Sequence, residues 1–97
     1  MKVTGEQVER VRALVAAIPA GKVATYGDIA DAAGLSSPRI VGWIMATDSA
    51  DLPWHRVLRA TGRPAAHLRT RQLGLLGAEG IAVINGKVAL RDVRHRF

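Results

Sequence analysis

The sequence contains no cysteine among its 97 residues, and this absence excludes several kinds of chemistry. Without a thiol there is no disulfide framework, no thiolate nucleophile and no zinc–thiolate site. No apolar run approaches the roughly 18 residues that a membrane span needs. Charged residues recur over residues 1–11, where a secretory signal would be apolar. We therefore expect a cytoplasmic protein with no membrane contact.

The second half of the chain has few acidic residues. Residues 1–52 carry five Lys/Arg and six Asp/Glu, a net charge of −1, whereas residues 53–97 carry nine Lys/Arg and two Asp/Glu, a net charge of +7. Eleven of the fourteen cations are arginine, the side chain that holds phosphates through two parallel hydrogen bonds. Nucleic acid is the leading partner on this pattern, although an arginine-rich genome would raise the count in the same way.

The composition and the length of the chain predict one folded domain over residues 1–97. Hydrophobic residues make up 48% of the chain, which argues against disorder. The length suits a single small core, and there is no internal repeat. The first helix is expected after Thr4, which has capping-box spacing to Gln7, and to stop at Pro19–Gly21. Its apolar stripe at helical spacing is Val8, Val11, Leu14, Val15 and Ile18.

Two shorter helices are predicted next. After an irregular connector at residues 23–26, Thr25 caps a helix that ends near Ala33, with Gly34 as its C-terminal stop. Ser37 and Pro38 have the N-cap and first-turn chemistry of another helix. Two short helices around a glycine-containing turn are typical of a helix-turn-helix, whose second helix enters a DNA groove.

The second of these helices presents two faces. Its inward face is expected to be Ile40, Val41, Ile44 and Met45, and its other face carries Arg39, Gly42 and Ala46. Gly42 leaves the backbone bare, so that face can approach DNA closely. Close packing against another helix explains a glycine there equally well. Trp43 is expected in the core.

The C-terminal third predicts a helix followed by a hairpin. The helix runs from about Leu68 to Ala78, with Leu73, Leu75 and Leu76 apolar and Gly80 at its end. Asn85-Gly86 between β-branched runs indicates a hairpin with a type I′ turn over residues 81–90. The basic tail, residues 91–97, is expected to fray or to touch DNA. The predicted fold is mainly α with a small β-hairpin, a winged helix-turn-helix DNA-binding domain.

Four short motifs stand in a fixed order along the chain. They are Pro-x-Gly-x-Val-x-x-Tyr-Gly at 19–27, Arg-x-Val-Gly at 39–42, Pro-Trp-His-Arg-Val at 53–57 and Glu-Gly at 79–80. Together they resemble the DNA-binding domain of the O6-alkylguanine-DNA alkyltransferases, from Ile18 to Ile81. In that family the third motif reads Pro-Cys-His-Arg-Val. Trp54 therefore stands where the family has its alkyl-accepting cysteine.

The tryptophan changes the function that the resemblance implies. Alkyl transfer needs a soft nucleophile of lowered pKa, and an indole offers only an N–H donor. The chain is similar to the cysteine-less alkyltransferase-like branch. That branch implies non-enzymatic recognition of O6-alkylguanine in double-stranded DNA, flipping of the base into a pocket, and marking of the lesion for nucleotide excision repair.

The resemblance also assigns roles to single residues. Arg39 would fill the vacated stack, and Tyr26 would rotate the phosphate beside the flipped nucleotide. Trp54 would line the lesion pocket, where stacking on a base is worth on the order of 1–3 kcal/mol. Either His67 or Arg69 would contact the lesion, and the sequence leaves that choice open. Gly42 completes the set of DNA-binding residues.

The remaining motif residues belong to a vestigial active-site loop formed by Pro53, His55, Arg56 and Glu79. His55 and Glu79 match the residues that activate the thiolate, and we expect a structural hydrogen bond between them. Arg56 is expected to hold the loop or a neighbouring carbonyl. The chain departs from the family by lacking an asparagine between Arg39 and Pro53, which affects the expected geometry of that linker.

Several expectations complete this interpretation. The protein is expected to act as a monomer near the nucleoid, with nucleotide excision repair proteins as partners and no cofactor or metal. The alternatives are a winged-helix transcription regulator and a hydrolase that uses His55, although no metal-ligand set or activated nucleophile accompanies that histidine. We also expect Arg39→Ala to weaken lesion binding strongly, and Arg94→Ala to act mainly through general, salt-dependent affinity.

Overall fold

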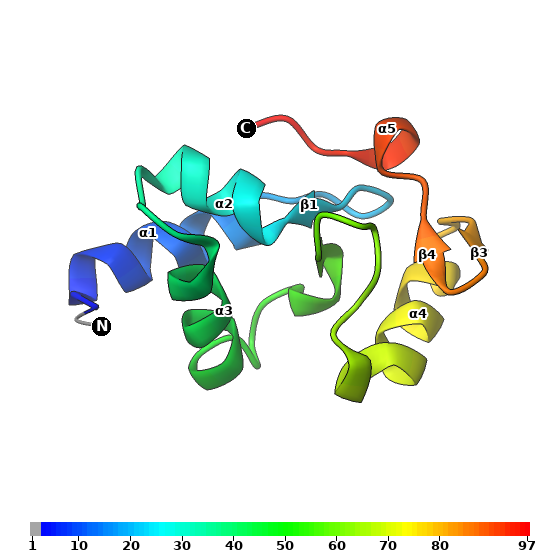
Figure 1. Ribbon diagram of the computed structural model, residues 1–97, viewed down its shortest axis with the longest axis horizontal. Helices are drawn as coiled ribbons and strands as arrows, with labels where there is room; N and C mark the ends of the chain where they lie inside the picture. The colour runs from blue at the N-terminus through cyan, green and yellow to red at the C-terminus, as the bar shows by residue number, and fades with distance from the viewer. Residues whose placement is uncertain (1–2) are drawn as a thin grey trace.

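Helices dominate the computed structural model, which describes residues 3–97 (Figure 1). The helices and strands, in chain order, are α1 (Gly5–Ala16), β1 (Ala24–Thr25), α2 (Tyr26–Ala33), α3 (Pro38–Thr47), the 3-10 turn η1 (Trp54–Arg56), β2 (Val57–Leu58), the 3-10 turn η2 (Ala66–Leu68), α4 (Arg69–Ala78), β3 (Val83–Ile84), β4 (Lys87–Val88) and α5 (Leu90–Val93). The predicted class, mainly α with a small hairpin, is confirmed. None of the described helices is long and apolar enough to cross a membrane.

Local capping signals place the first helices where the sequence predicts them. Thr4 and Gln7 make both hydrogen bonds of a capping box at the start of α1. Thr25 and Asp28 form a second capping box at the start of α2, which ends at Gly34 in the left-handed conformation with φ 70°. Ser37 accepts a hydrogen bond from the backbone of α3. α1 ends at Ala16, earlier than expected, yet Ile18 is still buried.

The predicted connector at residues 23–26 contains a strand that the sequence did not indicate. β1 pairs in parallel with β2, Ala24 opposite Val57 and Thr25 opposite Leu58. Two-residue strands so far apart in sequence leave no local pattern. Both strands are fully buried, and burying a side chain such as Leu58 contributes about 1.5–3 kcal/mol. The pair fixes the end of η1 and hence the Trp54 motif.

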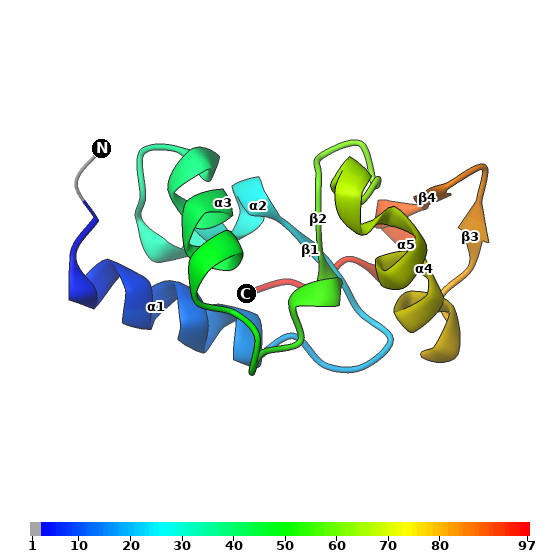
Figure 2. The ribbon, with the colours of Figure 1, turned by 90° about the horizontal axis from the view of Figure 1, so that it is seen from below.

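Two hydrophobic clusters lie on either side of this strand pair. The first gathers side chains from α1, α2 and α3, and it consists of Val11, Val15, Ile18, Ala24, Ile29, Ala30, Ala33, Ile40, Val41, Ile44 and Val57. The second lies under α4 and the hairpin, and it consists of Val23, Leu58, Leu76, Ile81 and Val88. Both views place α1–α3 at one end, α4 with the hairpin at the other, and β1–β2 between them (Figures 1 and 2).

The predicted hairpin is present at the C-terminal end. β3 and β4 pair antiparallel, with Val83 opposite Val88. Asn85 and Gly86 have φ values of 55° and 77°, the two positive values that a type I′ turn requires. α4 buries Leu76 and the polar Gln72, whereas Leu75, one of the apolar residues of the predicted helix, is 37% exposed.

The basic tail does not fray. Val23 donates to the Val93 carbonyl at 2.9 Å and accepts from His95 at 2.7 Å, so the tail runs beside the start of β1. Arg94 makes two hydrogen bonds to Asp28, at 2.9 and 2.6 Å. These bonds lower the pKa of Asp28. Arg94 is therefore a structural residue that holds Asp28, and its role in general DNA affinity stays a prediction.

Candidate functional site

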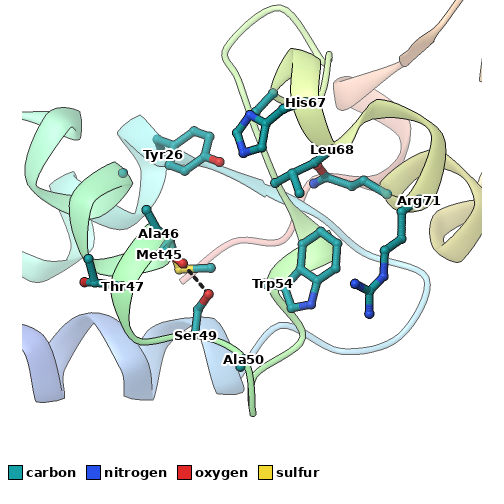
Figure 3. Close-up of a pocket in the computed structure, with 13 residues that line it drawn as sticks. Tyr26, Met45, Ala46, Thr47, Ser49, Ala50, Trp54, His67, Leu68 and Arg71 are labelled. Atoms are coloured by element: carbon teal, nitrogen blue, oxygen red, sulfur yellow. Dashed lines mark hydrogen bonds between the residues drawn. The ribbon is translucent and has the colours of Figure 1, made fainter.

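An open cavity of about 460 Å³ lies between α3 and the start of α4 (Figure 3). It is lined by Tyr26, Gly42, Met45, Ala46, Thr47, Ser49, Ala50, Trp54, Ala65, His67, Leu68, Arg71 and Gln72. Four of these side chains are the aromatic or cationic groups Tyr26, Trp54, His67 and Arg71. A concave site with an apolar wall and a few polar groups is the usual form of a small-ligand pocket. Among residues 3–97, no three histidine or acidic side chains gather to hold a metal ion.

Trp54 forms one wall of the cavity. It is the first residue of η1, and its backbone N–H donates to the Leu52 carbonyl at 2.7 Å. Because η1 leads directly into β2, the buried strand pair anchors the loop that carries the indole. The guanidinium of Arg71 lies 5.4 Å from the centre of the indole ring, a cation–π contact (Figure 3). An aromatic face with a cation beside it suits a flat, electron-rich ring.

Tyr26 and His67 line the cavity from different elements. Tyr26 is the first residue of α2, immediately after its capping threonine, so its ring position is set by the helix start. Burial raises the pKa of Tyr26, and the positive charge of Arg59 opposes that rise, so the phenol is protonated at neutral pH. His67 comes from η2, and Figure 3 places both rings at the same edge of the cavity.

α3 presents Arg39, Gly42 and Trp43 on its accessible side. Arg39 is exposed and Gly42 lines the cavity. A Cβ added to Gly42 would meet no atom within 4 Å, so close helix packing does not explain the glycine. Trp43 is 52% exposed, and its predicted place in the core is wrong. Ile40, Val41 and Ile44 fill the inward face, and Trp43 lies one turn beyond Arg39 on the outer face.

The predicted bond between His55 and Glu79 is present, outside the cavity lining. His55 Nε2 lies 2.6 Å from Glu79 Oε2. The Arg56 guanidinium donates to the same carboxylate, with Nη2 at 2.8 Å, and its Nη1 donates to the Ile18 carbonyl at 2.9 Å. The Gly21 N–H donates to Glu79 Oε1 at 3.0 Å. Arg56 thus holds a neighbouring carbonyl, as the sequence indicates.

These contacts determine the charge of Glu79. Burial would raise its pKa, but the hydrogen bonds from Arg56, His55 and the Gly21 backbone outweigh burial and lower the pKa to about 2. The carboxylate is therefore ionised at neutral pH. One anion joins η1, the end of α4 and the loop after α1, so Glu79 acts as a structural tie for the Trp54 loop.

Of the two candidate lesion contacts, the structure places His67 in the cavity lining and Arg69 outside it. Arg69 begins α4 and points to the hairpin, with Nη2 next to Gly86. The sequence analysis did not identify Arg71, which lies two residues after Arg69 and lines the cavity. It also missed Gln72, whose Nε2 donates to the carbonyls of His55 and Val57 at 3.0 and 2.8 Å. The motif spacing carries no signal for either residue.

A separate ion-pair cluster fixes the loop that forms the far wall. Arg12 of α1 donates to the Asp48 carbonyl at 2.8 Å and to Asp51 Oδ2 at 2.6 Å. The hydrogen bond from Arg12 lowers the pKa of Asp51. Ser49 donates to the Met45 carbonyl within the same loop. The linker that lacks the family's asparagine is thus held by contacts to α1 and α3.

Comparisons with known proteins agree with this geometry. The sequence profile of the family described as 6-O-methylguanine DNA methyltransferase, DNA binding domain, matches residues 6–81. A DNA base-flipping protein from Vibrio parahaemolyticus is 41% identical over 91 residues, covering 88% of this chain and 91% of that protein. A DNA base-flipping protein from Escherichia coli K12 is 39% identical over 98 residues, covering 92% of this chain and 74% of that protein.

Solved structures give the same result. S. pombe Atl1, in complex with damaged DNA containing O6-carboxymethylguanine, has a TM-score of 0.88 and 30% identity, covering 99% of this chain and all of that one. The Mycobacterium tuberculosis O6-methylguanine methyltransferase has a TM-score of 0.66 and 31% identity, covering 80% of this chain and 50% of that one. The chain therefore belongs to the O6-methylguanine-DNA methyltransferase family, as an alkyltransferase-like protein with Trp54 in the Pro-x-His-Arg motif.

Proposed function

We propose that this protein recognises O6-alkylguanine in double-stranded DNA without removing the alkyl group. The observation that carries the proposal is the cavity between α3 and α4, whose wall holds Trp54 at the motif position of the acceptor cysteine. The names of the similar proteins support it, because two are base-flipping proteins and one binds DNA that contains O6-carboxymethylguanine. The lesion base would leave the duplex and enter this cavity.

The residues around the cavity suit base flipping. Extruding a base costs a few kcal/mol, and less for a lesion that pairs poorly. Arg39, exposed on α3, would fill the vacated stack, and the bare backbone at Gly42 lets the helix approach the duplex. Tyr26 would press against the phosphate of the extruded nucleotide. Trp54 and His67 would enclose the base, and Arg71 would hold the indole in place.

The chemistry of the site argues for binding alone. An indole has no nucleophilic lone pair to accept an alkyl group, and the chain has no cysteine elsewhere. His55 and Glu79, which match the residues that activate the thiolate, have no thiol to activate, and Glu79 also binds Arg56.

A protein that binds a lesion and leaves it intact needs a downstream process to remove it. We propose that the complex marks the lesion for nucleotide excision repair proteins, as a monomer on DNA near the nucleoid. The test measures the rate at which an excision-repair extract incises the lesion-bearing strand of a duplex, with and without the protein. Faster incision with the protein supports this step, and unchanged incision would refute it.

The binding proposal is tested by titration with two duplexes that differ by one O6-methylguanine. We expect tighter binding to the modified duplex and full recovery of the methylated base after the titration. Arg39→Ala should lower the affinity for the modified duplex, and the control Arg10→Ala, whose side chain is tied to Glu6 and the Ala33 carbonyl, should not. Equal affinity for both duplexes would sink the proposal and favour a winged-helix regulator that reads sequence.

A further inference from the structure

Two arginines meet at the hairpin turn, on the side of α4 away from the cavity lining. Arg63, from the loop after β2, donates from Nη1 to the Asn85 carbonyl at 3.1 Å. Arg69, the first residue of α4, brings Nη2 to within 2.6 Å of the position that a Cβ on Gly86 would occupy, and Arg63 Nη1 lies 3.4 Å from the same point. The missing side chain at Gly86 therefore makes room for two converging guanidinium groups.

This pair of cations has no acidic partner in the described part of the chain. Neither Arg63 nor Arg69 forms an ion pair there, and the same holds for Lys87, the residue after the turn. The two acidic residues of the C-terminal half lie elsewhere, since Glu79 binds Arg56 and Asp92 lies beside Arg91. Converging like charges repel, and an anion between them would reverse the sign of that interaction.

The start of α4 places no acidic side chain beside these two arginines. α4 begins at Arg69, its N-cap residue Leu68 provides no side-chain cap, and its first turn holds no acidic residue. The first N–H groups of a helix lack partners inside the helix and carry a partial positive charge. The Arg69 N–H already donates to the Ala66 carbonyl, so the two guanidinium groups are the main attraction for an anion beside the hairpin turn. Arg63 and Arg69 are both exposed and accessible to a ligand.

We propose that Arg63 and Arg69, converging beside the hairpin turn, form a binding site for a backbone phosphate of DNA, outside the lesion pocket. The proposal rests on the function proposed above, because it takes duplex DNA as the ligand. His67, Leu68 and Arg71 line the cavity from the same end of α4, so a strand whose base enters the cavity passes this end of the helix. Arg63 and Arg69 lie within the matched residues 6–81, and the hairpin whose turn they contact follows from Val83.

The site makes a specific prediction about salt. Each phosphate neutralised by a cation makes the slope of log K against log salt steeper by about 0.9. The double variant Arg63→Gln/Arg69→Gln should therefore lose about 0.9 from this slope, equally on plain and O6-methylguanine duplexes. Duplexes of about 20 base pairs, at about 3.4 Å per pair, extend well past the longest dimension of the protein, 36 Å. The affinity ratio between the two duplexes should not change.

Two further variants serve as controls. Arg10→Gln/Lys22→Gln removes the same number of charges away from α4's first turn, and its slope should match the wild type. Arg63→Lys/Arg69→Lys keeps both charges and should keep most of the slope, which separates loss of a contact from a misfolded hairpin. An unchanged slope in the folded Gln/Gln variant would overturn the phosphate site. Absence of lesion preference in the wild type would instead refute the proposed function. The salt slopes of the variants would still test the phosphate contact.

Discussion

Trp54 and His55 are neighbours in one motif, yet they belong to two regions of opposite character. Around His55, the carboxylate of Glu79 accepts hydrogen bonds from Arg56, His55 and the Gly21 backbone, so the polar groups satisfy one another. Around Trp54, the side chains surround an open cavity and face solvent. Residues that would activate a nucleophile now hold the loop together, and the residue in the nucleophile's place lines the pocket.

The contrast separates stability from binding. A closed, charged cluster stabilises the fold only while all its members are present, since removal of one leaves the others buried and unpaired. An open pocket contributes little to folding and is available to a ligand. Changes in the Glu79 cluster should therefore alter unfolding, and changes around Trp54 should alter lesion binding. The following predictions test this separation from the largest expected effect to the smallest.

Glu79→Gln should be the most destabilising change. The amide keeps the shape of the side chain but leaves the half-buried Arg56 guanidinium without its counter-charge, at a cost of about 3 kcal/mol. For a domain of this size such a loss lowers Tm by about 15 °C. Thermal unfolding measures it, and Glu6→Gln, which breaks an exposed pair with Arg10, is the matched control with no resolvable change in Tm. Equal Tm values for the two variants would contradict a structural role for Glu79.

The same cluster can be titrated. The folded-state pKa of Glu79 is about 2 and its ordinary value is 4.5, so the unfolded chain takes up the proton first as pH falls. The contribution of the cluster is therefore complete above about pH 4.5 and is lost between pH 4.5 and about 2. The difference in unfolding free energy between wild type and Glu79→Gln, measured in denaturant, should shrink across this interval. A constant difference down to pH 2 would refute the lowered pKa.

Trp54→Ala should remove lesion preference and leave Tm nearly unchanged. Loss of an aromatic stacking partner costs on the order of 1–3 kcal/mol, or about 5- to 150-fold in affinity for the O6-methylguanine duplex. Trp43→Ala is the matched control, because Trp43 is the other tryptophan and lies outside the cavity lining. If both variants lose lesion preference to the same extent, the pocket does not read the lesion.

Arg71→Gln should have the smallest effect. An accessible cation–π contact is worth about 0.5–1 kcal/mol, so lesion affinity should fall by about two- to five-fold. The affinity for the plain duplex should stay the same, so the ratio of the two affinities should fall. Arg69→Gln, two residues earlier and outside the cavity lining, should weaken both duplexes alike, and competition binding distinguishes the two patterns. A loss of lesion ratio in Arg69→Gln alone would reverse the assignment of the two arginines.

Local chemistry explains which parts of this structure can be predicted from sequence. Thr4 with Gln7, Gly34, and Asn85 with Gly86 each specify a cap or turn within a few residues, and each is where it was expected. The His55–Glu79 bond was also predicted, because the motif resemblance relates two positions that are 24 residues apart.

Contacts between distant segments account for the differences. β1 and β2 are too short to leave a periodic pattern, and their pairing depends on the two clusters that meet around them. Arg94 reads as a free cation in a basic tail until Asp28 is brought beside it. Trp43 is hydrophobic enough for a core that α3 already fills with smaller side chains. Packing, and not motif spacing, determines which face of α4 lines the cavity, and this face carries Arg71 and not Arg69.

The central claim is that Trp54 meets a flipped alkylated base and does no chemistry on it. Trp43→Phe leaves Trp54 as the sole tryptophan and thus as the only indole fluorophore in the chain. Titration of this variant with an O6-methylguanine duplex should quench the fluorescence of Trp54 by stacking, and the methylated base should be recovered intact. A plain duplex at equal saturation should leave the fluorescence nearly unchanged. Equal quenching by both duplexes, or loss of the methyl group from the DNA, would contradict the account.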